Sequence, residues 1–295
     1  MSNFSKNIYS QHEEGTIIEE ILSKLKDNCN LECCEFGASD GIYFSNTYNL
    51  IHKKNYTALL IEPDKKKFRE LCKNIPYERV KKINAFVEFE GENSLDSFLE
   101  KYKFNKNFDF LSIDVDGNDY HIFDSIKKFS PKIICIEYNL TIPNDVIFVQ
   151  EKNKKINHGS SALALINLAK SKDYSPIAAT KQNIFFCHND FKSKVLGEKN
   201  YLINELIDDS EVKNYIFSGM DGTIFTSREL YLPWHGIIIK KIKLIPNYFN
   251  EFPANFNFLK KIVFTFYNVF KNPKNYRNKS QKYLNKLKDI FKIKD

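Results

Sequence analysis

Three carboxylates follow a short apolar run near the middle of the chain. Residues 111–121 read LSIDVDGNDYH, so Asp114, Asp116 and Asp119 fall within one short turn. Like charges placed this close are costly unless a cation, a basic substrate or a proton relieves them. Such clusters are typical of functional sites rather than of solvated loops. We therefore predict catalytic roles here, with Asp114, Asp116 and His121 as candidate bases.

A divalent metal is one way to relieve this charge, because hard cations favour oxygen ligands. However, the Asp-x-Asp-x-Asn run is too short for a calcium-binding EF-hand loop, and it lacks the later Glu of that loop. A metal stays open as an alternative, but the sequence does not favour it, and we predict no metal ligand.

A glycine-containing turn, residues 35–41 (EFGASDG), follows the first apolar run of the chain. Gly37 and Gly41 would let the backbone turn sharply and approach a ligand closely, and a following helix start offers free N–H groups. The turn suits a nucleoside, and Glu35 lies beside it. The spacing differs from Gly-x-Gly-x-x-Gly and no basic residue is ready for a pyrophosphate, which disfavours a nicotinamide cofactor. An ordinary strand-to-helix turn is the structural alternative.

Two further acids end predicted strands. Glu62 lies 25 residues after Gly37, where a carboxylate of an α/β nucleoside site accepts hydrogen bonds from ribose hydroxyls. Its alternative role is to cap the next helix. Glu137, followed by Tyr138 and Asn139, ends another run and is expected to face the same crevice, where it would act in catalysis by positioning the substrate. A plain strand end is the alternative for these three residues.

Apolar runs and helical segments alternate over the first two thirds of the chain, beginning with an amphipathic helix at residues 13–26. The runs predict parallel strands joined by helical crossovers, hence a doubly wound sheet with ligands at the carboxyl ends of its strands. The predicted strands are residues 31–36, 58–61, 83–87, 108–113 and 133–136, and the predicted helices are residues 44–52, 65–74, 94–102, 120–129 and 160–172.

The residues after the fifth predicted strand suggest that the chain has two parts. Residues 177–179 and 184–186 predict a C-terminal antiparallel hairpin that closes the sheet, residues 191–234 a loop-rich extension, and residues 258–270 either a helix or a strand. The predicted fold is α/β and Rossmann-like, with a mostly parallel sheet, that hairpin and an added C-terminal segment. We expect a cofactor-binding domain over residues 1–191 and an accessory segment over residues 192–295.

Taken together, these motifs resemble class I S-adenosylmethionine-dependent methyltransferases, and among them the FkbM-type family. The resemblance covers roughly residues 9–191 and includes residues 9–11, 35–41, 61–63, 93–96, 112–120 and 136–139. It implies that Glu35, Gly37 and Gly41 surround the methionine part of S-adenosylmethionine, that Glu62 holds the ribose and that Asp114 lies beside the methyl donor. It also implies that Ser10 and Gln11 close over the site. The sequence departs from the family pattern at residues 12–15 and matches nothing assignable beyond residue 191.

Composition places the chain among folded proteins, with 42% hydrophobic and 27% charged residues. The six cysteines form no Cys-x-x-Cys pair and are expected to be free thiols. No apolar stretch reaches the roughly 18 residues of a membrane span, and residues 1–9 lack a secretory signal. We expect a cytoplasmic protein that is not integral to a membrane.

Charge is distributed unevenly. Residues 239–295 contain 14 Lys and Arg against 3 Asp and Glu, a net charge of +11, whereas residues 1–238 carry −4. An apolar run followed by a basic one suits an anionic membrane surface. The preferred interpretation is that the run packs on the first domain or on a second copy of the chain, which leaves peripheral membrane contact and a homo-oligomer open. Nucleic acid is not an expected partner.

The sequence thus predicts a methyltransferase that uses S-adenosylmethionine to O-methylate a sugar or another small polar metabolite, with a carboxylate or His as base. Methyl transfer mainly requires alignment of the acceptor and removal of its proton. The alternatives are a non-catalytic binding module that uses the basic tail and a nicotinamide-dependent oxidoreductase. The dense carboxylates argue against the first, and the glycine spacing argues against the second.

Overall fold

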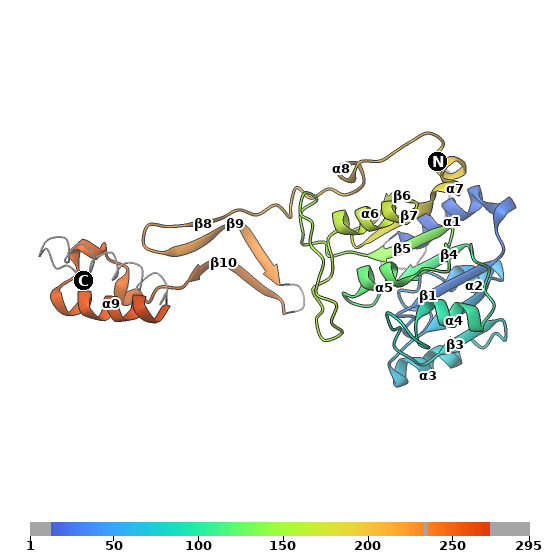
Figure 1. Cartoon of the computed structure of the whole chain (residues 1–295), viewed down its shortest axis with the longest axis horizontal. Helices are drawn as coiled ribbons and strands as arrows, with labels where there is room; N and C mark the ends of the chain where they lie inside the picture. Colours follow the sequence, from blue (N-terminus) through green and yellow to red (C-terminus); the bar gives the residue numbers. More distant parts are fainter. Residues whose placement is uncertain (1–12, 233–234, 272–295) are drawn as a thin grey trace, which may run out of the picture. The chain divides into compact units, whose positions relative to one another are not determined.

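The computed structural model describes residues 13–232 and 235–271. The chain divides into two compact units, residues 1–213 and 214–295, each drawn in Figure 1. The division of the chain into residues 1–191 and 192–295 stays a prediction about where the cofactor-binding part ends. The six cysteines are free thiols, as predicted.

The first unit is built on a seven-stranded sheet of order β3-β2-β1-β4-β5-β7-β6. Neighbouring strands from β3 to β5 run parallel, while β7 is antiparallel to both β5 and β6. The predicted mostly parallel sheet with a C-terminal hairpin is confirmed. The strands are β1 (Glu32–Phe36), β2 (Thr57–Ile61), β3 (Val80–Ile83), β4 (Phe110–Ile113), β5 (Ile133–Glu137), β6 (Tyr174–Ala179) and β7 (Asn183–His188).

Helices cover both faces of this sheet. Apolar side chains of α1, α2, α3 and α7 pack on one face, and those of α4, α5 and α6 pack on the other. Figure 1 labels these helices around the sheet. Successive strand residues alternate between the two cores: Cys33 joins the first and Cys34 the second. The helices are α1 (Glu14–Lys24), α2 (Tyr48–Lys54), α3 (Lys65–Asn74), α4 (Leu95–Lys101), α5 (Asp119–Ser125), α6 (Ala162–Ser171), α7 (Asn189–Leu196) and α8 (Ile203–Leu206).

One predicted strand was placed wrongly. The apolar run at residues 83–87 predicted the third strand, but β3 lies earlier, at Val80–Ile83. It pairs only with β2 at the sheet edge, where lysines such as Lys81 and Lys82 are tolerated. The Asn84 side chain then donates hydrogen bonds to the carbonyls of Glu62 and Pro63, which turns the chain away from the sheet.

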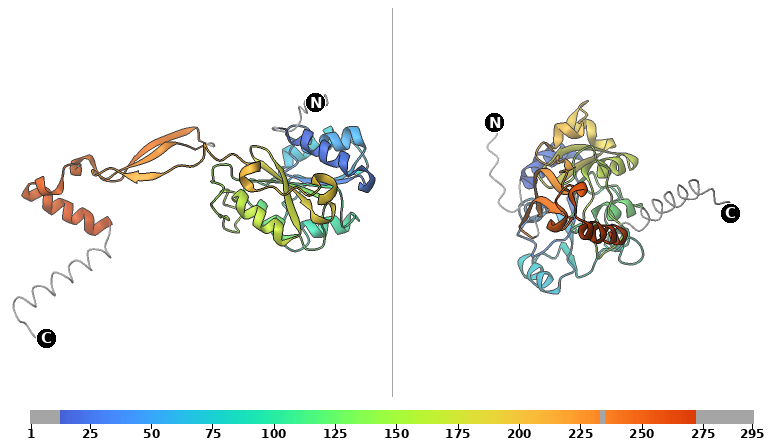
Figure 2. Two further views of the ribbon diagram at one scale, coloured as in Figure 1. Left: turned by 90° about the horizontal axis from the view of Figure 1, so that it is seen from above. Right: turned by 90° about the vertical axis from the view of Figure 1, so that its left-hand side faces the viewer.

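The second unit contains a three-stranded antiparallel sheet, β10-β9-β8, drawn as a long ribbon in Figure 2. Its elements are β8 (Ile216–Ser218), β9 (Thr223–Leu232), β10 (Ile237–Lys243), two single-turn helices and α9 (Phe258–Lys271). The run at residues 258–270, for which helix and strand were both open, is therefore helical. Helices α7 and α8 and strands β8 and β9 lie where a loop-rich segment was predicted. Most β8–β10 side chains are exposed, so no alternation marked these strands.

Candidate active site

The β1 and β4 loops touch through a glycine. Gly37 has a φ of 75°, and a Cβ built on it would lie 2.0 Å from the Asp114 carbonyl oxygen. Gly41 has a φ of 79°, and its Cβ would lie 2.5 Å from a Leu71 methyl group. A side chain fits at neither position without displacement, so both glycines are needed for this turn.

Glu35, at the end of β1, is buried and binds the turn at residues 45–47. Its carboxylate accepts hydrogen bonds from the Ser45 hydroxyl at 2.7 Å, the Thr47 hydroxyl at 2.5 Å and the Asn46 backbone N–H at 2.7 Å. Burial raises the pKa of Glu35, and these hydrogen bonds lower it again. The Asn46 side chain continues the network to the Ser112 hydroxyl on β4 at 3.0 Å. Glu35 therefore fixes the loops around the candidate cofactor site.

Glu62 joins the ends of β1 and β2. One carboxylate oxygen accepts the Ser39 backbone N–H at 2.8 Å, and the other accepts the Asp64 N–H at 2.8 Å. The capping residue of α3 is Asp64, whose side chain accepts the N–H groups of Lys66 and Lys67. Because a carboxylate has about four acceptor sites, Glu62 keeps acceptor capacity beyond these two hydrogen bonds.

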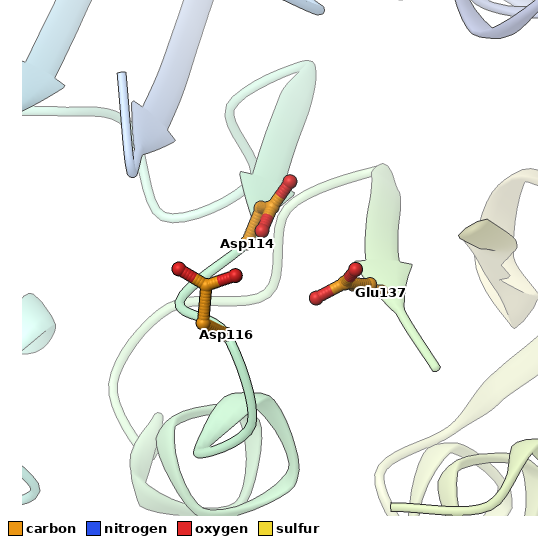
Figure 3. A group of neighbouring side chains, drawn as sticks. All are labelled: Asp114, Asp116 and Glu137. Carbon is orange, nitrogen blue, oxygen red and sulfur yellow. The ribbon is translucent and has the colours of Figure 1, made fainter. Parts of the chain in front are cut away.

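Asp114, Asp116 and Glu137 come together at the carboxyl ends of β4 and β5 (Figure 3). One carboxylate oxygen from each lies within 4.8 Å of those of the other two, a set that could also hold a metal ion. Burial, followed by the charges of Asp119 and Asp116, raises the pKa of Asp114 to about 7. Burial, followed by the charges of Asp114, Asp119 and Asp116, raises the pKa of Glu137 to about 9. Two of the three groups can therefore hold protons near neutral pH.

Asp119 shapes the turn that carries the two aspartates, a role that sequence reasoning did not assign. Its buried carboxylate accepts the Val115 N–H at 3.0 Å and the Gly117 N–H at 2.9 Å, and burial raises its pKa to about 6. The turn places Asp116 at a φ of 54° with its side chain exposed. The Asp-x-x-Asp spacing was a usable signal, since Asp side chains often bind the backbone of their own turn.

His121 lies beside a different segment. Its Nε2 is 2.8 Å from the Gln150 carbonyl oxygen, and its ring packs edge-on against Phe89 and Tyr120. Among the described residues, the group of clustered ligand atoms does not include His121. The Gln150 side chain, which the sequence analysis missed, accepts the N–H groups of His158 and Gly159. A loop glutamine carries no signal for such a role.

The other predicted residues lie elsewhere or outside the description. Tyr138 donates its hydroxyl to the Thr180 carbonyl at 3.1 Å, and the Asn139 side chain donates to the His158 carbonyl at 2.6 Å. Of the Glu-Tyr-Asn run, Glu137 is the member of the carboxylate cluster (Figure 3). Ser10 and Gln11 fall outside the described residues. Glu14, close to them in sequence, is buried and accepts the Thr180 hydroxyl at 2.7 Å.

Comparisons with known proteins bear on the first unit. Residues 90–175 match the family model described as the methyltransferase FkbM domain. This segment includes β4, β5 and all three clustered carboxylates. Among curated proteins, none matches the chain significantly.

Several solved methyltransferase structures are similar at low identity. One is the N-methyltransferase NodS from Bradyrhizobium japonicum WM9, with 11% identity over 59% of this chain and 92% of that chain and a TM-score of 0.38. Another is the CMeT domain of the citrinin polyketide synthase, with 10% identity over 62% of this chain and 55% of that chain and a TM-score of 0.40. A third is a TehB-like SAM-dependent methyltransferase from Corynebacterium glutamicum, with 8% identity over 57% and 87% and a TM-score of 0.32.

The fold and the matched segment define a Rossmann-like methyltransferase. The matched segment, residues 90–175, is of the FkbM methyltransferase type, as the sequence motifs predicted. Such domains generally use S-adenosylmethionine and a small-molecule acceptor. In the described parts of the chain, no helix has the length and apolar character needed to cross a membrane.

Proposed function

We propose that the chain transfers the methyl group of S-adenosylmethionine to a hydroxyl of a sugar or another small polar metabolite, with a carboxylate as base. The observation that carries this proposal is the meeting of Asp114, Asp116 and Glu137 at the carboxyl ends of two central strands. Strands β1 and β4 are neighbours in the sheet. The chain continues from β1 to β2 on one side of this pair and from β4 to β5 on the other side. Ligands of doubly wound sheets bind at such a switch point in strand order.

The residues present fit S-adenosylmethionine. Ribose hydroxyls are donors, and the Glu62 carboxylate at the end of β2 retains acceptor capacity. Gly37 lets the turn after β1 pack directly against the Asp114 backbone, which brings this turn beside the candidate base. Glu35 is already bonded to the turn at residues 45–47, so we assign it the role of holding the cofactor loops rather than of binding the methionine part directly.

When bound, the cofactor supplies an electrophilic methyl group on a sulfonium. Asp114 then removes the proton of the acceptor and holds it. A base works best when its pKa is near the working pH, and Asp114, with a pKa of about 7, meets that condition better than an ordinary carboxylate. Glu137, whose pKa is about 9, is protonated at neutral pH and can donate a hydrogen bond that positions the acceptor oxygen. Asp116, the exposed member, would contact the acceptor.

His121 is the second candidate base. If its Nε2 donates to the Gln150 carbonyl, the neutral ring keeps an acceptor lone pair on Nδ1. We place it after the carboxylates, because it lies outside the group of clustered ligand atoms. A His121→Gln variant with normal turnover would exclude it as the base.

Calorimetric titration with S-adenosylmethionine, S-adenosylhomocysteine and NAD tests the proposal directly. We expect the first two to bind and NAD not to bind. Tight binding of NAD alone would favour the oxidoreductase alternative, and binding of none of the three would favour a non-catalytic module. Turnover measured against a panel of sugars, before and after exhaustive chelation, then tests the acceptor class and the metal. Loss of activity on chelation and recovery with Mg²⁺ would show that the carboxylates hold a cation.

A further inference from the structure

One face of α9 is fixed within the second unit by an aromatic cluster. The ring of Phe264 lies 5.1 Å from that of Phe249 and 5.2 Å from that of Phe256. The Tyr267 ring lies 5.4 Å from that of Phe249, in a tilted arrangement, and the Tyr267 hydroxyl donates to the Leu244 carbonyl at 2.9 Å. The helix therefore has a defined inner face and, by its 3.6-residue period, a defined outer face.

Lys260 strengthens this inner contact. Its ammonium lies 3.1 Å from a Glu251 carboxylate oxygen and 4.8 Å from the ring centres of both Tyr248 and Phe256. The lysine is buried. Turning α9 about its own axis would separate the buried Lys260 charge from Glu251 and from the two aromatic rings. Because an unpaired buried charge is costly, these contacts fix which face of the helix points inward.

The outer face of α9 is apolar and exposed. Phe266 is 65% exposed and Phe270 is 88% exposed. These side chains recur at the three- and four-residue spacing of one helix face. The exposed apolar members of this outer face are Phe258, Leu259, Ile262, Val263, Phe266 and Phe270. We call these six residues the α9 outer face. Patches of this kind mark interaction sites.

The positive charge of the surrounding segment indicates what kind of partner binds the α9 outer face. The apolar face belongs to a region, residues 239–295, that carries a net charge of +11. A second copy would bring the same positive charge to the interface and be repelled, whereas an anionic lipid surface attracts a segment rich in Lys and Arg. The combination of an apolar helix face with many lysines is typical of helices that lie in a membrane interface.

We propose that the α9 outer face docks on an anionic membrane surface, to which the net positive charge of residues 239–295 attracts it. The 14 residues of α9 extend about 21 Å, and an interfacial helix lies in the plane of the membrane with its apolar face among the acyl chains. In the described part of the chain no helix can span a bilayer, so the attachment is peripheral.

The test is sedimentation of the full chain with vesicles of phosphatidylcholine alone and of phosphatidylcholine with about one third phosphatidylglycerol. We expect binding to the anionic vesicles at least tenfold stronger than to the neutral ones, and weaker binding as salt rises. The double substitution Phe266→Ser with Phe270→Ser should lower binding at least tenfold, because two aromatic side chains lose their apolar burial.

Met220→Ser is the matched control, since Met220 is an exposed apolar residue of the second unit that lies outside the α9 outer face. It should bind like the unmodified chain. Circular dichroism checks that each variant is folded. The comparison of anionic with neutral vesicles uses the unmodified chain, so it tests the proposal even if a variant fails to fold. Equal binding to both vesicles, or binding that the double substitution leaves unchanged, would overturn the proposal. A dimer in analytical ultracentrifugation that dissociates on the double substitution would assign the face to a second copy instead.

Discussion

The Cα of Gly37 lies so close to the Asp114 backbone that a Cβ on Gly37 would be 2.0 Å from the Asp114 carbonyl oxygen. The cofactor loop after β1 and the carboxylate loop after β4 are thus in contact through main chain. A change in one loop must displace the other, which links the candidate cofactor site to the candidate base.

Replacement of Gly37 by Ala tests this link, with Gly91→Ala as the control. Gly91 has a similar φ of 82° but nothing within 4 Å of its Cβ position. Both variants should lose about 1–2 kcal/mol of unfolding free energy from the left-handed backbone, measured by urea unfolding. Gly37→Ala should lose more and should also weaken S-adenosylmethionine binding at least tenfold. Equal losses in the two variants would show that the close approach is unimportant.

Glu62→Ala should weaken S-adenosylmethionine binding by about 1.5–3 kcal/mol, the usual loss for a hydrogen bond to a charged group. The Ser39 and Asp64 N–H groups also lose their acceptor, so a loss of stability is expected as well. Asp64→Ala, which removes the cap of α3, is the control for helix destabilisation alone. Calorimetry should find normal cofactor affinity in Asp64→Ala, and unchanged affinity in folded Glu62→Ala would refute the ribose assignment.

Asp114→Asn, Asp116→Asn and Glu137→Gln should lower kcat while the chain stays folded. A general base typically contributes about 10²–10⁴-fold, so we expect the largest effect at Asp114. Asp124→Asn, an exposed acid on α5, should leave turnover unchanged. If the three site variants all methylate at the normal rate in single-turnover assays, the carboxylates are not the base.

The raised pKa values predict that stability falls as pH rises. Folded Asp114, Asp119 and Glu137 keep their protons up to about pH 7, 6 and 9, whereas unfolded carboxyls ionise near pH 4. The folded state therefore binds more protons between about pH 4 and 9, and the free energy of unfolding decreases with pH across that range. Urea unfolding at pH 5 and pH 8 should show this decrease.

The same measurement on Asp114→Asn and Glu137→Gln should show a smaller decrease between the two pH values, because one titrating group is removed from each. Asp124→Asn should behave like the unmodified chain. A pH dependence that none of the site variants reduces would mean that these groups do not titrate in the predicted range.

Asp109→Ala should destabilise the first unit by about 3–5 kcal/mol, because it leaves the buried Lys132 charge unpaired. The two side chains form an ion pair of 2.6 Å, and Asp109 also accepts the N–H groups of Asn30 and Leu31. Asp109 lies at the amino end of β4, away from the site, so S-adenosylmethionine affinity should be retained in the folded fraction. Glu100→Ala breaks an exposed ion pair with Lys128 and should change stability little. A similar effect of both variants on thermal unfolding would contradict the prediction.

The sequence by itself determined the order of most elements in the first unit. Strands with both faces buried, such as β4 (Phe110–Ile113) and β5 (Ile133–Glu137), are continuous apolar runs, and α3 (Lys65–Asn74) has the predicted bounds. The motifs were also sufficient for the FkbM-type methyltransferase domain, which the match at residues 90–175 confirms. Local sequence patterns predict these elements because burial of one face makes apolar residues recur every 2 residues in a strand or every 3.6 residues in a helix.

Only the tertiary structure decided which residues meet. Glu137 joins Asp114 and Asp116, while His121 turns to Gln150, although His121 is nearer to the aspartates in sequence. Strand pairing sets these distances, because it brings together the ends of β4 and β5 and fixes where each following turn points. The exposed strands β8–β10 were missed for the same reason. Where neither face of a strand is buried, the strand is held by hydrogen bonds to its neighbours, and its own sequence shows no apolar pattern.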